Sequence, residues 1–353
     1  MTTEQIPFSL ATSDLEHVLV QTEPLWREVR GHRLFITGGT GFVGMWLVES
    51  FAWINARLGL NASACILTRN AKSTRAKFPW LAADPALSYH TGNAASLDFP
   101  SGEFSHVIHA ATENDSVIHP LDPATHFDAN VQSTRRVLEF ARRSATKRIL
   151  FTSSGAVYGR QPATLTHLPE DFAGAPNPQD PSTAYGQSKR ASEFLFAAAA
   201  REGDSTISTA RIFAIVGPYL KLDANFAIGN FMRDAMCGNT IKIQGDGTPL
   251  RSYLYAADMA VWLWTILLKG ESGHAYNVGS DQAISISHLA KTVSDVVAPG
   301  TTVQVAQKAD PNRPPARYLP DICKAREKLG LKVCVPLSEA ISRTVQWHRN
   351  QKS

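Results

Sequence analysis

The sequence is poor in cysteine and nearly balanced in charge. Its 353 residues include 4 cysteines, none of them in a CxxC pair or beside a histidine cluster, so nothing indicates a structural zinc site or a disulfide framework. We therefore expect reduced thiols and no bound metal ion. The 35 basic and 31 acidic residues leave a net charge of +4, and no basic run with interleaved aromatic residues occurs. No nucleic-acid partner is indicated.

Long hydrophobic runs are also missing. No stretch approaches the roughly 18 apolar residues that a membrane span needs, and residues 261–268 suit only a buried helix. The first 30 residues carry acidic side chains and lack the basic-then-apolar order of a signal peptide. With 44% hydrophobic and 19% charged residues, the composition is that of a soluble globular protein. We expect no membrane partner and a cytoplasmic location.

Residues 1–31 are predicted to form a helical arm. The expected N-cap is Ser13 or Asp14. Apolar side chains then fall on one helical face, at Leu15, Val18, Leu19 and Leu25. Such a face must be buried, so the arm is expected to pack on the core or on a second subunit.

A strand, a glycine-rich turn and a helix follow the arm. Residues 34–36 are consecutive apolar residues, as in a strand buried on both faces, and helical spacing begins at residue 42. The glycines between them lie three residues apart. Backbone N–H groups of such a turn, together with the positive end of the new helix, can approach a phosphate. The sequence therefore predicts a dinucleotide-binding turn made by Gly38, Gly41, Phe42, Val43 and Gly44.

Four further strands are expected, at 64–69, 87–92, 106–112 and 148–152, with a helix over 127–143. This alternation predicts an α/β fold with a doubly wound parallel sheet of Rossmann type. Asn93 follows the third strand, where a polar side chain can meet an adenine. The small residues Ala110, Ala111 and Thr112 end the fourth strand, where they let a nicotinamide ribose lie close to the backbone. His109, just before them, is interpreted as a structural histidine.

The end of the second strand bears on the choice of cofactor. An acidic residue at this position accepts the ribose hydroxyls of NAD, whereas a basic residue accommodates the 2′-phosphate of NADP. Here the strand ends in Thr68 and Arg69, and Lys72 and Arg75 follow. This favours NADP over NAD, with the alternative that the basic side chains only begin a solvated helix.

The chemistry is expected where the fifth strand runs into Ser153 and Ser154, because the carboxyl ends of the strands line the ligand crevice. Tyr185 and Lys189 are four residues apart and share one helical face. A neighbouring ammonium and a cationic nicotinamide both favour a tyrosine phenolate. Tyr185 is therefore the predicted acid/base, and the Ser154 hydroxyl shares its bond to a substrate oxygen.

These residues resemble the extended short-chain dehydrogenases/reductases, in particular the nucleotide-sugar epimerase/dehydratase group. The resemblance runs from about residue 32 to the C-terminal helix. Its motifs are Thr37–Gly44, His109–Ala111, Asn130–Val131, Ser153–Ser154 before Val157–Gly159, Tyr185 with Lys189, Arg211–Phe213 with Val216–Pro218, Gly245–Thr248, Arg251–Tyr255 with Asp258, and Tyr276–Gly279.

The resemblance assigns roles to residues that the local pattern leaves open. It implies that Lys189 binds the nicotinamide ribose, that Ser154 binds the reacting sugar oxygen, and that the substrate is a nucleoside-diphosphate sugar. Asn130, Ser153, Phe213 and Val216 complete the expected cofactor site. The expected substrate residues, some of which could instead be ordinary loop or surface residues, are Asn225, Gln244, Arg251 and Arg313.

One departure from the family pattern narrows the reaction. The 4,6-dehydratases carry an aspartate and a glutamate directly after the hydroxyl residue, and decarboxylases of the group tend to keep the glutamate; here Gly155 and Ala156 follow Ser154. A dehydratase is therefore disfavoured, and an epimerase that oxidises and re-reduces a sugar carbon is preferred. The alternatives are an NADPH-dependent keto-sugar reductase with the same residues, and a cofactor-sensing binding module without catalysis.

The resemblance also implies a division of the chain. Residues 32–216, with returning segments near 240–280, are expected to form the cofactor domain, and residues 217–240 and 283–353 most of the substrate lobe. A homodimer is expected through the helices at 127–143 and 181–201.

Overall fold

The structure, a computed structural model, describes residues 8–112, 122–224 and 226–351. The chain forms two compact units. The first comprises Met1–Ser154, Asn177–Arg211 and Ala260–Tyr276; the second comprises Gly155–Pro176, Ile212–Met259 and Asn277–Ser353. Each is considered by itself.

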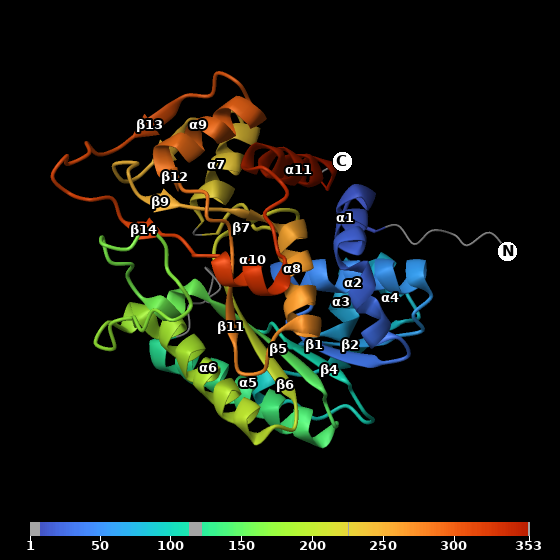
Figure 1. The fold of residues 1–353 in the computed structure, drawn as a ribbon. Helices are drawn as coiled ribbons and strands as arrows, with labels where there is room; N and C mark the ends of the chain where they lie inside the picture. Colours follow the sequence, from blue (N-terminus) through green and yellow to red (C-terminus); the bar gives the residue numbers. More distant parts are fainter. Residues whose placement is uncertain (1–7, 113–121, 225, 352–353) are drawn as a thin grey trace. The chain divides into compact units, whose positions relative to one another are not determined.

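The first unit is built on a seven-stranded sheet with the strand order β11-β6-β5-β4-β1-β2-β3 (Figure 1). Neighbouring strands β1–β2, β1–β4, β2–β3 and β4–β5 pair in parallel. The order reverses beside β1, which makes the sheet doubly wound and confirms the predicted fold class. The strands are β1 (Arg33–Thr37), β2 (Ser63–Thr68), β3 (Leu87–Thr91), β4 (His106–His109), β5 (Arg148–Ser154), β6 (Thr206–Ile212) and β11 (Ala275–Val278).

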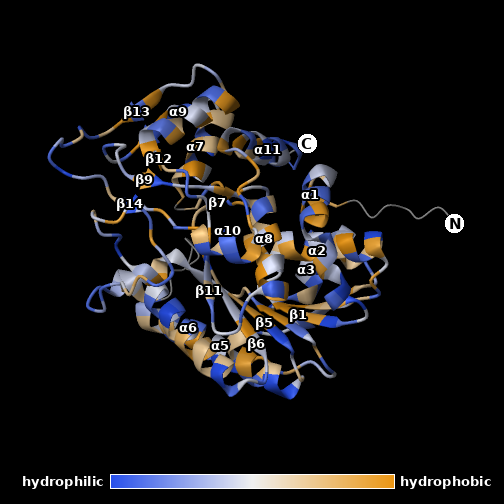
Figure 2. Ribbon diagram, viewed as in Figure 1, coloured by the Kyte–Doolittle hydropathy of each residue, from blue (hydrophilic) through white to orange (hydrophobic). Residues whose placement is uncertain are grey.

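Helices cover both faces of this sheet. Helices α5 (Pro123–Arg143) and α6 (Ala184–Glu202) pack against each other and enclose an aromatic core in which the ring of Phe140 lies 4.6 Å from that of Phe35. Helices α2 (Phe42–Leu58) and α8 (Ala256–Lys269) lie on the other face (Figure 1). Apolar side chains are concentrated on the strands and on α8 (Figure 2). The short helices of this unit are α3 (Ala71–Lys77), α4 (Pro79–Ala82), η2 (Ala94–Ser96) and η4 (Pro181–Thr183).

The N-terminal arm packs on the core of the first unit. It consists of α1 (Thr12–Thr22) and η1 (Glu23–Val29). The ring of Trp26 is fully buried, 4.7 Å from the ring of Trp264 on α8. The expected N-cap was wrong: Ala11 occupies that position without a side-chain cap, and Asp14 lies inside the first turn, 1% exposed.

The second unit contains short strands and four helices among its described residues. Helix α9 (Ile286–Val297) contacts both α7 (Ala227–Met236) and α11 (Leu337–Asn350); the fourth helix is α10 (Cys323–Leu329). The strands are β7 (Ile215–Val216), β8 (Ile241–Ile243), β9 (Leu250–Arg251), β10 (Leu254–Tyr255), β12 (Ile284–Ser285), β13 (Val303–Val305) and β14 (Arg317–Tyr318); the turn η3 spans Gly155–Tyr158. Across the described residues of both units, every helix falls short of the length and apolarity that a membrane span requires.

Candidate active site

The glycine turn between β1 and α2 fits closely against β4. Gly38 has φ +70°, and a Cβ there would lie 2.5 Å from the Ala110 carbonyl group and the Ala111 nitrogen. A Cβ at Gly44 would lie 2.1 Å from the Gly38 oxygen. Both positions therefore require glycine.

Gly41 differs from the other two glycines because its surroundings are open. A Cβ there would meet only the Gly38 oxygen, at 3.4 Å. Gly41 is exposed and is the N-cap of α2, without a side-chain cap. The N–H groups at the first turn of α2, which begins with Phe42 and Val43, are thus available to an anion, so the turn fits the pyrophosphate of a dinucleotide.

The end of β2 presents basic side chains. Thr68 is buried and its hydroxyl lies 2.8 Å from that of Thr74, whereas Arg69 is exposed. The Asn70 side chain caps α3 by accepting from the Ser73 N–H at 2.9 Å. Asn93, placed in the expected adenine region, is exposed, and its side chain accepts from the Ala95 N–H at 2.8 Å.

The Tyr185 side chain is hydrogen-bonded to the Ser154 hydroxyl. Tyr185 opens α6 and Ser154 closes β5, so the two hydroxyl groups meet at the carboxyl edge of the sheet. Burial raises the pKa of Tyr185 above its usual value of 10, and the bond with Ser154 acts in the opposite direction. In the cofactor-free protein the tyrosine is therefore a neutral phenol.

Lys189 is almost completely buried, with 2% exposure. Its ammonium group donates to the Thr112 hydroxyl at 2.8 Å and to the Thr152 carbonyl at 2.9 Å. Its Nζ lies 5.9 Å from the centre of the Tyr185 ring. Burial lowers the pKa of Lys189 from 10.5 to about 7, and the carboxylate of Glu193 acts in the opposite direction. Tyr185, Lys189, Ser154 and Thr112 thus lie close together in the structure.

His109 is a buried residue of the core of the first unit. It is 1% exposed, its Nδ1 lies 2.8 Å from the Thr37 hydroxyl, and its Nε2 lies 3.5 Å from the Thr134 hydroxyl. Burial lowers the pKa of His109 to about 3. A neutral ring with both nitrogens engaged ties β4 to β1 and α5, which agrees with its interpretation as a structural residue.

Two residues near the site, Glu193 and His126, were not singled out from the sequence. Glu193 accepts a hydrogen bond from Ser153 and forms an ion pair with Arg211. His126 is 4% exposed; its ring is parallel to the Tyr185 ring within 6°, at 6.2 Å between centroids. Asn130, predicted to lie near the cofactor, donates from its side chain to the His126 carbonyl at 3.0 Å. The i, i+4 spacing of Lys189 and Glu193 was the one feature of the sequence that could have pointed to Glu193.

Several predicted residues lie in the second unit. Phe213 is buried with its ring 4.6 Å from that of Tyr318, and Val216 is buried on β7. Arg251 is partly buried and donates to the Leu250 carbonyl at 2.9 Å. Gln244 and Arg313 are exposed. Asn225 lies outside the described residues.

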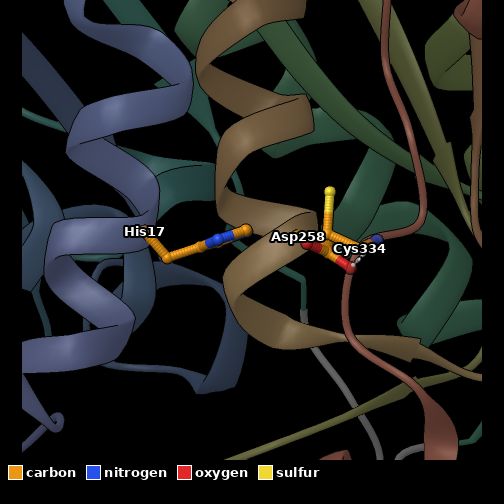
Figure 3. Close-up of side chains that lie close together, drawn as sticks. All are labelled: His17, Asp258 and Cys334. Atoms are coloured by element: carbon orange, nitrogen blue, oxygen red, sulfur yellow. Dashed lines mark hydrogen bonds between the residues drawn. The ribbon is translucent and has the colours of Figure 1, made fainter.

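Asp258 stabilises the start of α8 within the second unit. Its carboxylate accepts from the backbone N–H of Val335 at 3.0 Å. It also accepts from the backbone N–H of Cys334 at 2.8 Å (Figure 3). The third residue drawn there, His17, belongs to the first unit. These hydrogen bonds give the Asp258 of the family motif a structural role.

Comparisons with known proteins agree with this geometry. The sequence model of the NAD dependent epimerase/dehydratase family matches residues 34–279. UDP-glucuronic acid decarboxylase 5 from Arabidopsis thaliana is 29% identical over 327 residues, covering 88% of this chain and 87% of the relative. UDP-glucuronic acid decarboxylase 1 from Xenopus tropicalis is 25% identical over 321 residues, covering 90% of this chain and 72% of the relative.

Solved structures share the fold. A UDP-glucose 4-epimerase from Thermotoga maritima, solved with UDP-glucose, superposes with a TM-score of 0.73 at 20% identity, covering 91% of this chain and 100% of that one. A dTDP-glucose 4,6-dehydratase from Bacillus anthracis, solved with NAD, also has a TM-score of 0.73, at 17% identity, covering 91% and 97%. At these identities the similarity concerns the fold alone.

Proposed function

Because the chain belongs to the NAD-dependent epimerase/dehydratase family, we propose that it is a nucleotide-sugar epimerase with a retained nicotinamide cofactor. The reaction removes hydride and a proton from one sugar carbinol and returns both, with hydride added to the opposite face of the resulting ketone. The observation that carries the proposal is the bonded Tyr185–Ser154 pair beside the buried Lys189 ammonium.

Each of these side chains has a defined task. Tyr185 takes the hydroxyl proton as the ketone forms and returns it at re-reduction. Ser154 holds the same sugar oxygen. Lys189 supplies positive charge to the phenolate and a donor to the ribose, and Thr112 and Thr152 fix its position. NAD or NADP, bound along the glycine turn, would accept and return the hydride.

Gly155, the residue after Ser154, leaves little room for the aspartate side chain that is typical of enzymes that eliminate water. A Cβ at Gly155 would lie 2.5 Å from the Tyr318 hydroxyl and 2.8 Å from the Phe213 ring. An aspartate, the residue typical of the dehydratases, does not fit there without displacing both rings. With Ala156 next in the chain, no carboxyl group is available at either position for proton transfer in an elimination.

Decarboxylation is a second candidate, favoured by the similarity to the UDP-glucuronic acid decarboxylases. Oxidation of a uronic acid at the carbon β to its carboxylate gives a β-keto acid. Such an acid loses CO2 with little catalytic help, so Tyr185, Lys189 and Ser154 suffice for the oxidation that starts either reaction.

One experiment separates the candidates. The purified protein is denatured to release and identify any bound nucleotide, and fresh protein is incubated with UDP-glucose, UDP-galactose or UDP-glucuronic acid. The epimerase predicts interconversion of two sugars without added cofactor and without CO2. Release of CO2 from UDP-glucuronic acid would establish the decarboxylase. Turnover of a keto-sugar only with stoichiometric NADPH would establish a reductase, and binding without turnover a sensing module.

The remaining assignments belong to the same proposal. Arg69 favours NADP, although the family and the NAD-bound dehydratase are described with NAD. The second unit, with Arg251, Gln244 and Arg313, is proposed to bind the nucleoside diphosphate. Helices α5 and α6 are proposed as the homodimer interface.

A further inference from the structure

Three consecutive residues of β5 are bonded to one face of α6. The Ser154 side chain bonds to Tyr185, the Thr152 carbonyl accepts from Lys189, and the Ser153 hydroxyl donates to the Glu193 carboxylate at 2.5 Å. The helical residues are spaced i, i+4 and i+8, which puts them on the same face over two turns. Glu193 is therefore the third member of a row whose other two members are the proposed catalytic residues.

Glu193 is held from the opposite side by Arg211 of β6. The Nε of Arg211 lies 3.1 Å from both carboxylate oxygens, and its Nη2 lies 2.7 Å from Oε2. The two side chains are only 14% and 16% exposed. Two-point contact between a guanidinium and a carboxylate fixes orientation as well as distance. The carboxylate cannot turn away from Ser153 without breaking this contact.

The charge of Glu193 also acts on Lys189. Among residues 8–112, 122–224 and 226–351, the titratable groups near the Lys189 ammonium are Tyr185 and Glu193 on α6 and His109 on β4, and Arg211 is bound to Glu193. His109 is neutral near pH 7, since its pKa is about 3. Glu193 is thus the negative charge that opposes the loss of the Lys189 proton caused by burial.

We propose that Glu193 is a positioning residue of this active site: through Ser153 it holds the end of β5 against α6, and it places a negative charge one helical turn from Lys189. This inference rests on the proposed function. It gives Glu193, four residues after Lys189, a role in positioning. The hydride and proton transfers themselves remain as proposed above.

The decisive variants are Glu193→Gln and Arg211→Met. Glutamine keeps an oxygen for Ser153 and Arg211 but has no charge, whereas Arg211→Met removes the ion pair and leaves the Glu193 charge beside Lys189. The pair borders a surface hollow of about 280 Å³, which gives the altered side chains room. The matched control is Glu139→Gln on α5, whose ion pair with Arg136 spans 2.7 Å and does not touch β5.

We expect Glu193→Gln to move the alkaline limb of the kcat profile to lower pH. At a fixed pH on that limb kcat falls about tenfold, the effect of losing an opposite charge one helical turn away, while KM stays unchanged. Arg211→Met lowers the unfolding midpoint and does not move the alkaline limb to lower pH, because the Glu193 charge remains, and Glu139→Gln leaves both the midpoint and the profile nearly unchanged. The proposal would be overturned if kcat depended on pH in the same way in the wild type and in Glu193→Gln. It would also be overturned if Glu193→Gln and Arg211→Met shifted the alkaline limb of kcat equally.

A measurement independent of turnover separates this inference from the proposed function. The free energy of urea unfolding, followed against pH in cofactor-free protein, reports the Lys189 proton directly. We expect the Glu193→Gln curve to bend at lower pH than the wild-type curve even if no sugar nucleotide is turned over. If Glu193→Gln does not fold, Glu193→Asp is tested in its place. Aspartate keeps the negative charge, but its shorter side chain no longer reaches the Ser153 hydroxyl. We then expect kcat to fall without a shift of the alkaline limb. An Asp variant with wild-type kcat would remove the positioning role.

Discussion

Replacing Lys189 with methionine tests whether the ammonium group is buried in the way the structure indicates. Methionine keeps an unbranched apolar chain and removes the charge. In the unfolded chain a lysine keeps its proton up to about pH 10.5, whereas in the folded protein burial lowers the pKa of Lys189 to about 7. Between these values the unfolded state binds more protons. Wild-type stability must therefore rise with pH relative to the methionine variant.

The size of this effect follows from the two pKa values. Integrating the difference in bound protons from pH 7 to pH 9 gives about 2 kcal/mol of added stability for the wild type relative to Lys189→Met. Other ionisable groups cancel because both proteins carry them. The measurement is urea unfolding of both cofactor-free proteins at pH 7, 8 and 9.

The control is Lys291→Met. Lys291 is 68% exposed on α9 and forms an i, i+4 ion pair with Asp295. The free energy of unfolding of Lys291→Met should therefore differ from that of the wild type by the same amount throughout this pH range. A flat difference for Lys189→Met as well would show that its ammonium is not destabilised by burial, and the reasoning about its charge would fail.

Three further changes test other parts of the site. Tyr185→Phe should lower kcat at least a hundredfold and leave the affinity for NAD, measured by fluorescence titration, nearly unchanged; retained turnover would remove the proposed acid/base. Arg69→Asp should weaken NADP binding more than NAD binding in the same titration, and an equal effect on both would end the case for a 2′-phosphate contact. His126→Phe should leave thermal stability unchanged or raise it by about 1 kcal/mol, because the buried Nε2 of His126 has no hydrogen-bond partner among residues 8–112, 122–224 and 226–351; a clear loss of stability would contradict that description.

The parts that the sequence predicted depend on local constraints. Gly38 and Gly44 are required because a Cβ at these positions would lie 2.5 and 2.1 Å from neighbouring backbone atoms, and such requirements leave a fixed spacing in the sequence. The apolar runs of β1, β2, β4 and β5 identify strands buried on both faces. The helix expected over 261–268 is buried in α8, where Trp262 and Trp264 are fully covered.

The parts that it missed depend on tertiary contacts. Arg211 is 18 residues from Glu193 and lies on strand β6, whereas Glu193 lies on helix α6, so no local sequence pattern indicates that they pair. The ring of His126 on α5 stacks on the ring of Tyr185 on α6, so this contact joins two different helices. The N-cap of α1 was misplaced because Asp14 is buried inside the first turn of the helix instead of preceding it. The substrate residues remain predictions because residues such as Gln244 and Arg313 are exposed and follow no motif that names a sugar.

In the proposed function the reaction type depends on the residue that follows Ser154, since oxidation of the sugar is common to all the candidate reactions. Tyr185 and Lys189 serve an epimerase, a reductase, a dehydratase or a decarboxylase equally well. The dehydratase pattern has a carboxyl residue directly after the hydroxyl residue, and at that position here a side chain on Gly155 would meet Tyr318 and Phe213. Gly155→Asp alone should therefore destabilise the second unit without creating dehydratase activity, because overpacking costs about 1–3 kcal/mol. If a stable Gly155→Asp variant eliminated water, the space beside Ser154 would not be what sets the reaction, and the preference for epimerisation would lose its structural basis.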